Sequence, residues 1–144
     1  MERYRKTSHV VYDCKYHFVW VPKYRFRILE GEIREALRKI LEQLCNWKEI
    51  VIIEGAIQSD HVHLYLGVPP KMSPSKVMKV LKGKSAGMLM KRFPELQKRY
   101  WGMHMWARGY FVSTSGVDER TIREYIRRQE EEEYQEEQLR LWKE

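Results

Sequence analysis

The chain has 144 residues, of which 43% are apolar and 12% aromatic, and it carries a formal net charge of +7. These values fit one globular domain, residues 1–144, and no apolar run approaches the roughly 18 to 20 residues of a membrane span. Seven acidic residues against Arg140 and Lys143 give residues 130–144 a net charge of −5, so residues 1–129 carry +12. A basic body favours a polyanionic partner such as nucleic acid, although a solvated basic surface without a partner stays open here.

The N-terminus and the cysteines predict a cytoplasmic protein. Residues 1–6 are mostly charged and lack the apolar segment and cleavage site of a signal peptide. Cys14 and Cys45 are far apart and outside any Cys-x-x-Cys pattern. They are therefore expected to be reduced thiols, not a disulfide or a thiolate metal site.

Residues 10–21 are rich in β-branched and aromatic side chains and predict the first strand. The next segment, residues 23–27, interleaves three cations with two aromatic residues, which suits phosphate contact and base stacking. Lys23, Arg25 and Arg27 are therefore candidate nucleic-acid-binding residues. A connector whose aromatic rings pack on the domain would explain the same pattern.

Residues 31–46 place apolar side chains at three- and four-residue spacing and predict the first helix. A nearly continuous β-branched run at 50–57 predicts the second strand. Only residues 58–60 separate this run from the next extended stretch. The two strands should therefore form an antiparallel hairpin.

A second helix is expected over residues 74–92, with Ser73 as its N-cap and Pro74 at its first position. The sequence Lys-Gly-Lys-Ser at 82–85 is not a nucleotide-binding phosphate loop, because Met78 stands where that motif needs glycine. The dense cations of this helix indicate a nucleic-acid face instead. The candidates are Lys79, Lys82 and Lys84.

Residues 101–114 predict a fourth strand, in which Gly109 marks a bulge or close approach and Arg108 is a further candidate nucleic-acid contact. Asp118 fits the N-cap of a last helix that continues into an acidic helical extension, residues 130–144. The order β-α-β-β-α-β-α implies an α+β fold, ferredoxin-like or RRM-like. Its antiparallel sheet would carry the main helices on one face and a C-terminal helix bearing Tyr125.

The stretch 58–68 reads Gln-Ser-Asp-His-Val-His-Leu-Tyr-Leu-Gly-Val. In a strand, His61 and His63 point to the same face with their Cα atoms about 7 Å apart, and the residues between them point to the core. Both imidazoles can then reach one ion, although a His-x-His strand is more often structural or part of an unrelated site. A histidine-triad nucleotide hydrolase would need a third alternating histidine, and Tyr65 occupies that position.

Tyr125 and Gln129 project from one stripe of the last helix, because they are spaced by about one turn. Packed over the free face of the sheet, this helix would bring both to the histidines. Gln129 would add an oxygen to His61 and His63, a mixed ligand set that suits Mg²⁺, Mn²⁺ or a related ion. Tyr125 would be the nucleophile toward a phosphate that the ion polarises. His17 is expected beside the site and not as a ligand.

Five ordered blocks make the chain resemble a known family, the small single-tyrosine HUH transposases of bacterial and archaeal insertion sequences. This is the TnpA type, with REP-associated tyrosine transposases as relatives. In one block, His-Val-His is the pattern of histidine, hydrophobe and histidine that names the superfamily. The blocks are residues 16–25, 59–64, 81–85, 106–114 and 125–129, within a resemblance that covers about residues 8–129.

The resemblance implies a metal-dependent enzyme that cleaves and rejoins single-stranded DNA at hairpin-bearing insertion-sequence ends. It maps His61, His63 and Gln129 onto the ligands of a Mg²⁺ or Mn²⁺ ion. It maps Tyr125 onto the nucleophile that forms a 5′-phosphotyrosine. It also implies a homodimer, in which the tyrosine helix of one subunit can complete the histidine site of the other.

A non-catalytic module is the alternative. An RRM-like protein would bind RNA or DNA through surface aromatic residues and lysines, and it would need neither a metal ion nor Tyr125. A covalent adduct between protein and DNA would distinguish the two functions.

Overall fold

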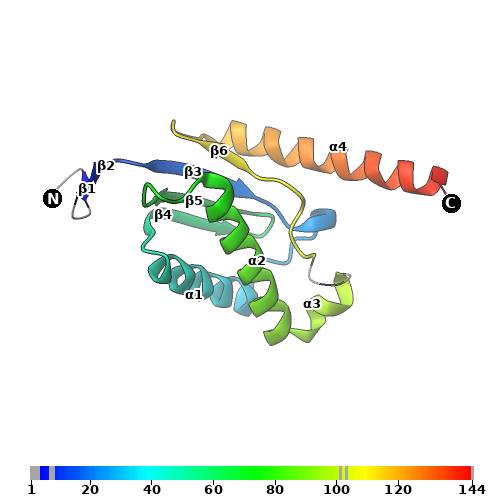
Figure 1. Cartoon of the computed structure of the whole chain (residues 1–144). Coiled ribbons are helices and arrows are strands. Elements are labelled where there is room, and N and C mark those ends of the chain that lie inside the picture. Colours follow the sequence, from blue (N-terminus) through cyan, green and yellow to red (C-terminus); the bar gives the residue numbers. More distant parts are fainter. Residues whose placement is uncertain (1–3, 7–8, 101, 103, 144) are drawn as a thin grey trace.

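The computed structural model describes residues 4–6, 9–100, 102 and 104–143. Its centre is a four-stranded antiparallel sheet in the order β4-β5-β3-β6 (Figure 1). The strands of this sheet are β3 (Lys15–Trp20), β4 (Val51–Gln58), β5 (His61–Gly67) and β6 (Phe111–Ser113). A separate two-stranded hairpin pairs β1 (Arg5–Lys6) with β2 (Val11–Tyr12). The strand order is that of the expected ferredoxin-like sheet.

The helices divide between the two faces of this sheet. Helices α1 (Gly31–Trp47) and α2 (Pro74–Arg92) cover one face, and α4 (Glu119–Lys143) lies on the side opposite α1 (Figure 1). A 3₁₀ turn, η1 (Lys23–Arg25), follows β3, and the short α3 (Pro94–Arg99) follows α2. Among the described residues, no helix combines the length and apolar character needed to cross a membrane.

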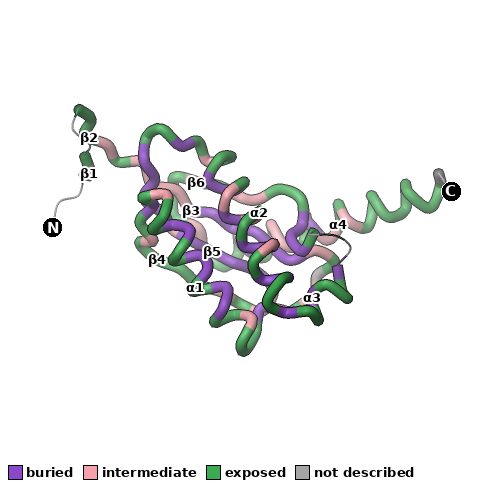
Figure 2. The backbone as a smooth tube through the Cα atoms, turned by 60° about the horizontal axis from the view of Figure 1, so that its bottom comes forward, coloured by how far each residue is buried: buried purple, intermediate pink, exposed green. Residues whose placement is uncertain are grey.

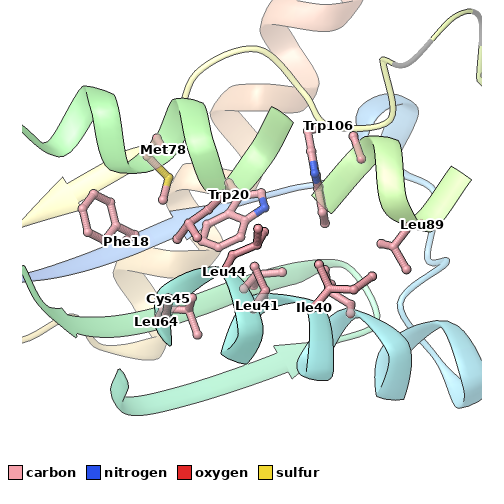
Figure 3. Close-up of a cluster of buried hydrophobic side chains, with 14 of the residues drawn as sticks. Phe18, Trp20, Ile40, Leu41, Leu44, Cys45, Leu64, Met78, Leu89 and Trp106 are labelled. Carbon is pink, nitrogen blue, oxygen red and sulfur yellow. The ribbon is translucent and has the colours of Figure 1, made fainter. Parts of the chain in front are cut away.

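The hydrophobic core fills the space between the sheet and helices α1 and α2 (Figure 3). Buried segments concentrate in β3, β5 and the inner sides of these helices (Figure 2). Trp20 and Trp106 meet edge to face with ring centroids 5.9 Å apart. The Trp106 indole nitrogen donates a hydrogen bond of 3.1 Å to Ser85 Oγ, which satisfies a polar group inside the core. With the backbone hydrogen bonds from Lys23 N to Met105 O and from Ala107 N to Val21 O, this packing holds residues 105–107 beside the end of β3.

The predicted first strand, residues 10–21, is in fact two strands. β2 pairs with β1, and β3 begins only at Lys15, after the carbonyl of Cys14 accepts a hydrogen bond of 2.8 Å from Val68 N. Val11 is 69% exposed, so burial in the core does not fix its register, and the alternation of β3 does not extend to it.

The predicted fourth strand, residues 101–114, is too long, because β6 spans only Phe111–Ser113. Residues 101 and 103 lie outside the described residues. An isolated bridge joins Trp106 to Pro22, and Lys82 Nζ donates to the carbonyls of Ala107 and Gly109. These contacts replace a regular ladder, and Gly109 adopts a φ of +85°, which favours glycine.

The helix predictions agree closely with the structure. Helix α2 runs unbroken over Pro74–Arg92, and Ser73 Oγ accepts from Lys76 N at 3.2 Å. Asp118 Oδ1 accepts from Thr121 N at 2.8 Å, which confirms the N-cap of α4. Helix α3 was not expected, although its proline at the first turn and basic residues in the last turn are ordinary helix signals.

Candidate active site on the α4 face of the sheet

The side chains on the α4 face alternate with those of the core. In the register of the sheet, His63 lies between Val19 on β3 and Ala56 on β4, and Tyr65 lies opposite His17. The residues between them in β3 and β5 belong to the core cluster. The predicted placement of the two β5 histidines on the face away from the core is therefore confirmed.

Asp60 fixes the first histidine of the pair. His61 is 2% exposed, and its Nδ1 lies 2.8 Å from Asp60 Oδ1. The other oxygen, Oδ2, accepts from Arg123 Nη1 at 2.9 Å and from Arg27 Nη2 at 3.4 Å. Burial alone would raise the pKa of Asp60, but its hydrogen bonds with His61 and Arg123 outweigh burial and hold that pKa below its usual value. Asp60 is therefore a carboxylate at neutral pH.

The second histidine pairs with β3. His63 Nε2 lies 3.1 Å from His17 Nδ1, and the His17 ring stacks on Tyr65 with centroids 4.0 Å apart. Burial lowers the pKa of both His17 and His63. Both imidazoles are neutral at pH 7, which is the form that binds metal ions. The expected position of His17 beside the site is confirmed.

Tyr125 packs on the same side of the sheet, over β6. Its ring centroid is 6.1 Å from that of Phe111, and Phe111 pairs with Val19, the neighbour of His63. Two strand spacings, about 10 Å, therefore separate Phe111 from His63 along the sheet. The phenol oxygen is buried and has no hydrogen-bond partner among the described residues. Burial, with a smaller contribution from Glu132, raises the pKa of Tyr125 above its usual value.

Gln129 lies one turn further along α4 and is 8% exposed. Its Nε2 donates to Glu132 Oε2 at 3.4 Å. Gln129 also lines a pocket of about 370 Å³, whose wall includes Asp60, Arg123 and Arg127. Gln129, the predicted amide ligand, therefore lines the same pocket as Asp60, which hydrogen bonds to His61.

The structure brings the predicted site residues to one face without joining them directly. Within the described part of the chain, no hydrogen bond connects Tyr125 or Gln129 to His61 or His63. In that same part, no three His, Cys, Asp or Glu side chains are grouped to hold a metal ion. The direct hydrogen bond between α4 and the turn before the histidine strand is instead that of Arg123 to Asp60.

The predicted nucleic-acid contacts lie on more than one surface. Lys79 and Lys84 line a groove on the outer side of α2, and Lys84 Nζ is 5.8 Å from the Trp47 ring. Lys23, Lys82 and Arg108 line a different pocket, which they share with three glutamates of α4. Arg27 borders the pocket beside Asp60, and the side chain of Arg25 lies outside the described residues.

Lys82 differs from the other candidates because its amine already has partners. Nζ donates to Ala107 O at 2.9 Å and to Gly109 O at 2.7 Å. Burial lowers the pKa of Lys82 to about 8. Its ammonium group therefore fastens α2 to the segment before β6.

Reasoning from the sequence assigned no role to Asp60 or Arg123. Asp60 carried a usable signal, since an acidic residue beside a buried histidine is a common hydrogen-bond partner. Arg123 carried none, because its contact with Asp60 spans 63 residues of sequence.

Comparison with known proteins identifies the family of the chain. The family model "Transposase IS200 like" matches residues 10–129. The chain is 43% identical over 137 residues to the transposase for insertion sequence element IS200 of Salmonella typhimurium, a match that covers 95% of this chain and 90% of that protein. It is 32% identical over 130 residues to the ISDra2 transposase TnpA of Deinococcus radiodurans, which covers 90% of this chain and 93% of that protein.

Solved structures give the same answer for the fold. The crystal structure of a candidate transposase from Deinococcus radiodurans R1 matches with a TM-score of 0.77 at 34% identity, over 87% of this chain and 97% of that one. The structure of a REP-associated tyrosine transposase bound to a REP hairpin matches with a TM-score of 0.54 at 12% identity, over 88% of this chain and 68% of that one. The latter likeness shows the fold alone.

The family model and the two curated relatives identify a transposase of the HUH type, and the ferredoxin-like sheet with its tyrosine-bearing helix is consistent with that class. More particularly, the chain belongs to the IS200-like transposase family.

Proposed function

We propose that this protein is a metal-dependent transposase that cleaves and rejoins single-stranded DNA at the hairpin-bearing ends of an insertion sequence. The observation that carries the proposal is the position of the tyrosine helix, which binds the histidine turn through Arg123 and Asp60. Membership of the IS200-like family supports strand-transfer chemistry. The structure of the REP-associated tyrosine transposase bound to a REP hairpin supports a hairpin in the substrate.

His61, His63 and Gln129 would hold a Mg²⁺ or Mn²⁺ ion. The chemistry of His61 fits, because an ionised Asp60 can only accept its Nδ1 hydrogen and so leaves its Nε2 free to ligate. His63 would ligate through Nε2 by giving up its 3.1 Å hydrogen bond with His17 Nδ1. Gln129 uses its nitrogen on Glu132, which leaves the amide oxygen without a hydrogen bond among the described residues. When bound, the ion would withdraw charge from the scissile phosphate.

Tyr125 would carry out the covalent step. Its phenol oxygen attacks phosphorus, the bond between phosphorus and the 3′ oxygen breaks, and the phenol proton ends on that oxygen as a 3′-hydroxyl. The 5′ end is then held as a phosphotyrosine. Because burial raises the pKa of Tyr125, the proton has to leave as attack proceeds. Joining reverses the step and needs no external energy source.

The test is formation of a covalent adduct. Protein mixed with hairpin-bearing single-stranded DNA and Mg²⁺ or Mn²⁺ should give a protein–DNA band that survives denaturing electrophoresis. Tyr125→Phe should lose this band, whereas Tyr134→Phe, an exposed tyrosine of the same helix, should keep it. A band that persists in Tyr125→Phe would contradict the assignment of the nucleophile. Hairpin binding by the unaltered protein without any band would support a non-catalytic nucleic-acid-binding module.

We further propose a homodimer in which Tyr125 of one copy serves the histidines of the other. In the single chain Tyr125 packs over β6, and its phenol oxygen has no hydrogen-bond partner among the described residues. A helix exchanged between identical copies makes the same contacts with the second copy. Mixing Tyr125→Phe subunits with His61→Ala subunits should then restore adduct formation, because one composite site is intact. A mixture as inactive as its parents would contradict the exchange.

A further inference from the structure

One carboxylate connects the two halves of the candidate active site. Asp60 Oδ1 lies 2.8 Å from His61 Nδ1 on the histidine strand, and Oδ2 lies 2.9 Å from Arg123 Nη1 on the tyrosine helix. The Asp60 side chain is 14% exposed, whereas that of Arg123 is 46% exposed, so water reaches the contact from the Arg123 side. Charge-assisted hydrogen bonds of this kind are short and directional.

The side of Asp60 that faces His61 determines the orientation of the imidazole. An ionised carboxylate has no hydrogen to donate, so Nδ1 of His61 must be the donor. The ring is then held with Nε2 directed away from Asp60. Outer partners of this type orient metal-binding histidines in many proteins.

The side that faces Arg123 connects the histidine turn to α4. Arg123 is on the same helix as Tyr125 and precedes it by half a turn, so holding its guanidinium limits both rotation and sliding of the tyrosine. Other polar contacts near it stay within the helix, such as that of Arg123 Nε to Glu119 and that of Gln129 to Glu132, and the Glu133 carboxylate further along α4 accepts from Tyr24 N at 3.0 Å.

We propose that Arg123 is a positioning residue, which through Asp60 aligns the tyrosine helix with the metal-binding histidine. This inference rests on the proposed function, because it takes Tyr125 as the nucleophile and His61 as a ligand. A single carboxylate thereby sets the orientation of the ligand and the position of the nucleophile. If the helix is exchanged between two copies, the same pairing joins Arg123 of one copy to Asp60 of the other.

The first test is the rate of adduct formation. Arg123→Gln should slow it on the order of tenfold, and Arg123→Lys should recover part of the rate because an ammonium can still reach Asp60. Arg120→Gln is the matched control, since it removes the same charge and a comparable helix pair, with Glu124, from the exposed side of α4. Equal rates for Arg123→Gln and Arg120→Gln would overturn the proposal.

The second test separates alignment of the helix from ligation. In protein without DNA, Asp60→Asn should weaken Mn²⁺ binding, measured by calorimetry, by about 10- to 100-fold, whereas Arg123→Gln should weaken it less, because Arg123 affects the ligands only through α4, which carries Gln129. Arg123→Gln should instead speed amide hydrogen exchange in the first turns of α4. Unchanged exchange in Arg123→Gln would contradict the proposal.

A third variant removes the other partner of Arg123. Glu119→Gln breaks the contact within the helix and spares the contact with Asp60, so its adduct rate should exceed that of Arg123→Gln. A Glu119→Gln rate as low as that of Arg123→Gln would contradict the proposal. If the unaltered protein forms no adduct at Tyr125, the proposed function fails, and hydrogen exchange still decides whether Arg123 holds α4.

Discussion

The two faces of the sheet come from the same strands but depend on different kinds of contact. On the α1 and α2 face, Phe18, Trp20 and Leu64 lie in one continuous apolar core. On the α4 face, His17 and His63 hydrogen bond to each other, although each directly precedes a core residue in sequence. Asp60 links the sheet to α4. Apolar contacts are nondirectional, whereas each hydrogen bond depends on a particular partner.

This difference predicts how the two faces respond to substitution. A core side chain contributes mainly to the free energy of unfolding, because its loss leaves a cavity. A polar side chain on the α4 face contributes mainly to chemistry, because its neighbours depend on its hydrogen bonds or its metal-binding nitrogen. The predictions below test that division.

The largest expected effect is on the α4 face. His61→Ala should abolish DNA cleavage and largely spare hairpin binding, because it removes a ligand and leaves the cations of the body in place. Cleavage assays and binding titrations on the same preparation measure the two effects. The control is His9→Ala, because His9 is exposed and distant in sequence from His61. Equal loss of binding and cleavage would show that His61 is structural.

A large loss of stability is expected on the core face. Trp20 is fully buried, so Trp20→Ala should lower the free energy of unfolding by about 3–5 kcal/mol in urea titrations. The 86% exposed Trp142 is the matched control, and Trp142→Ala should change that free energy by no more than about 0.5 kcal/mol. Similar values for the two variants would refute the division between the faces.

The smallest expected effect concerns Lys82, which fastens α2 to the segment before β6. Its pKa is about 8 in the folded protein, below the ordinary value of 10.5, so between these pH values the unfolded chain binds more protons. Stability should therefore gain as pH rises through this window, and Lys82→Met should lack that gain. Urea titrations at several pH values measure the free energy of unfolding. The control is Lys79→Met, on the exposed side of α2, which should keep the gain. Parallel pH profiles for the unaltered protein and Lys82→Met would contradict it.

Much of the fold was predictable because local signals agreed with the tertiary contacts. Ser73 and Pro74 fix the start of α2, and its apolar spacing runs on to the end. The prediction of a strand over 101–114 was wrong for residues before Phe111, because Trp106 packs in the core and Lys82 donates to the carbonyls of Ala107 and Gly109. Side chains of α2 make those contacts, and no local sequence pattern in 101–114 could predict them.

The candidate site was predictable only in part. The alternation of His61 and His63 follows from strand geometry, and the common stripe of Tyr125 and Gln129 follows from helix geometry. The depth at which α4 lies over the sheet does not follow from either periodicity. It depends on contacts such as that of Arg123 with Asp60, between residues distant in sequence.

The sharing of Asp60 has a consequence for how related sequences can diverge. A change at position 60 alters two partners at once, so a compensating change at either partner alone would leave the other unmatched. Positions 60 and 123 should therefore vary together among relatives and keep an acidic and a basic residue. Position 27, whose contact with Asp60 is longer and more exposed, should vary independently of both.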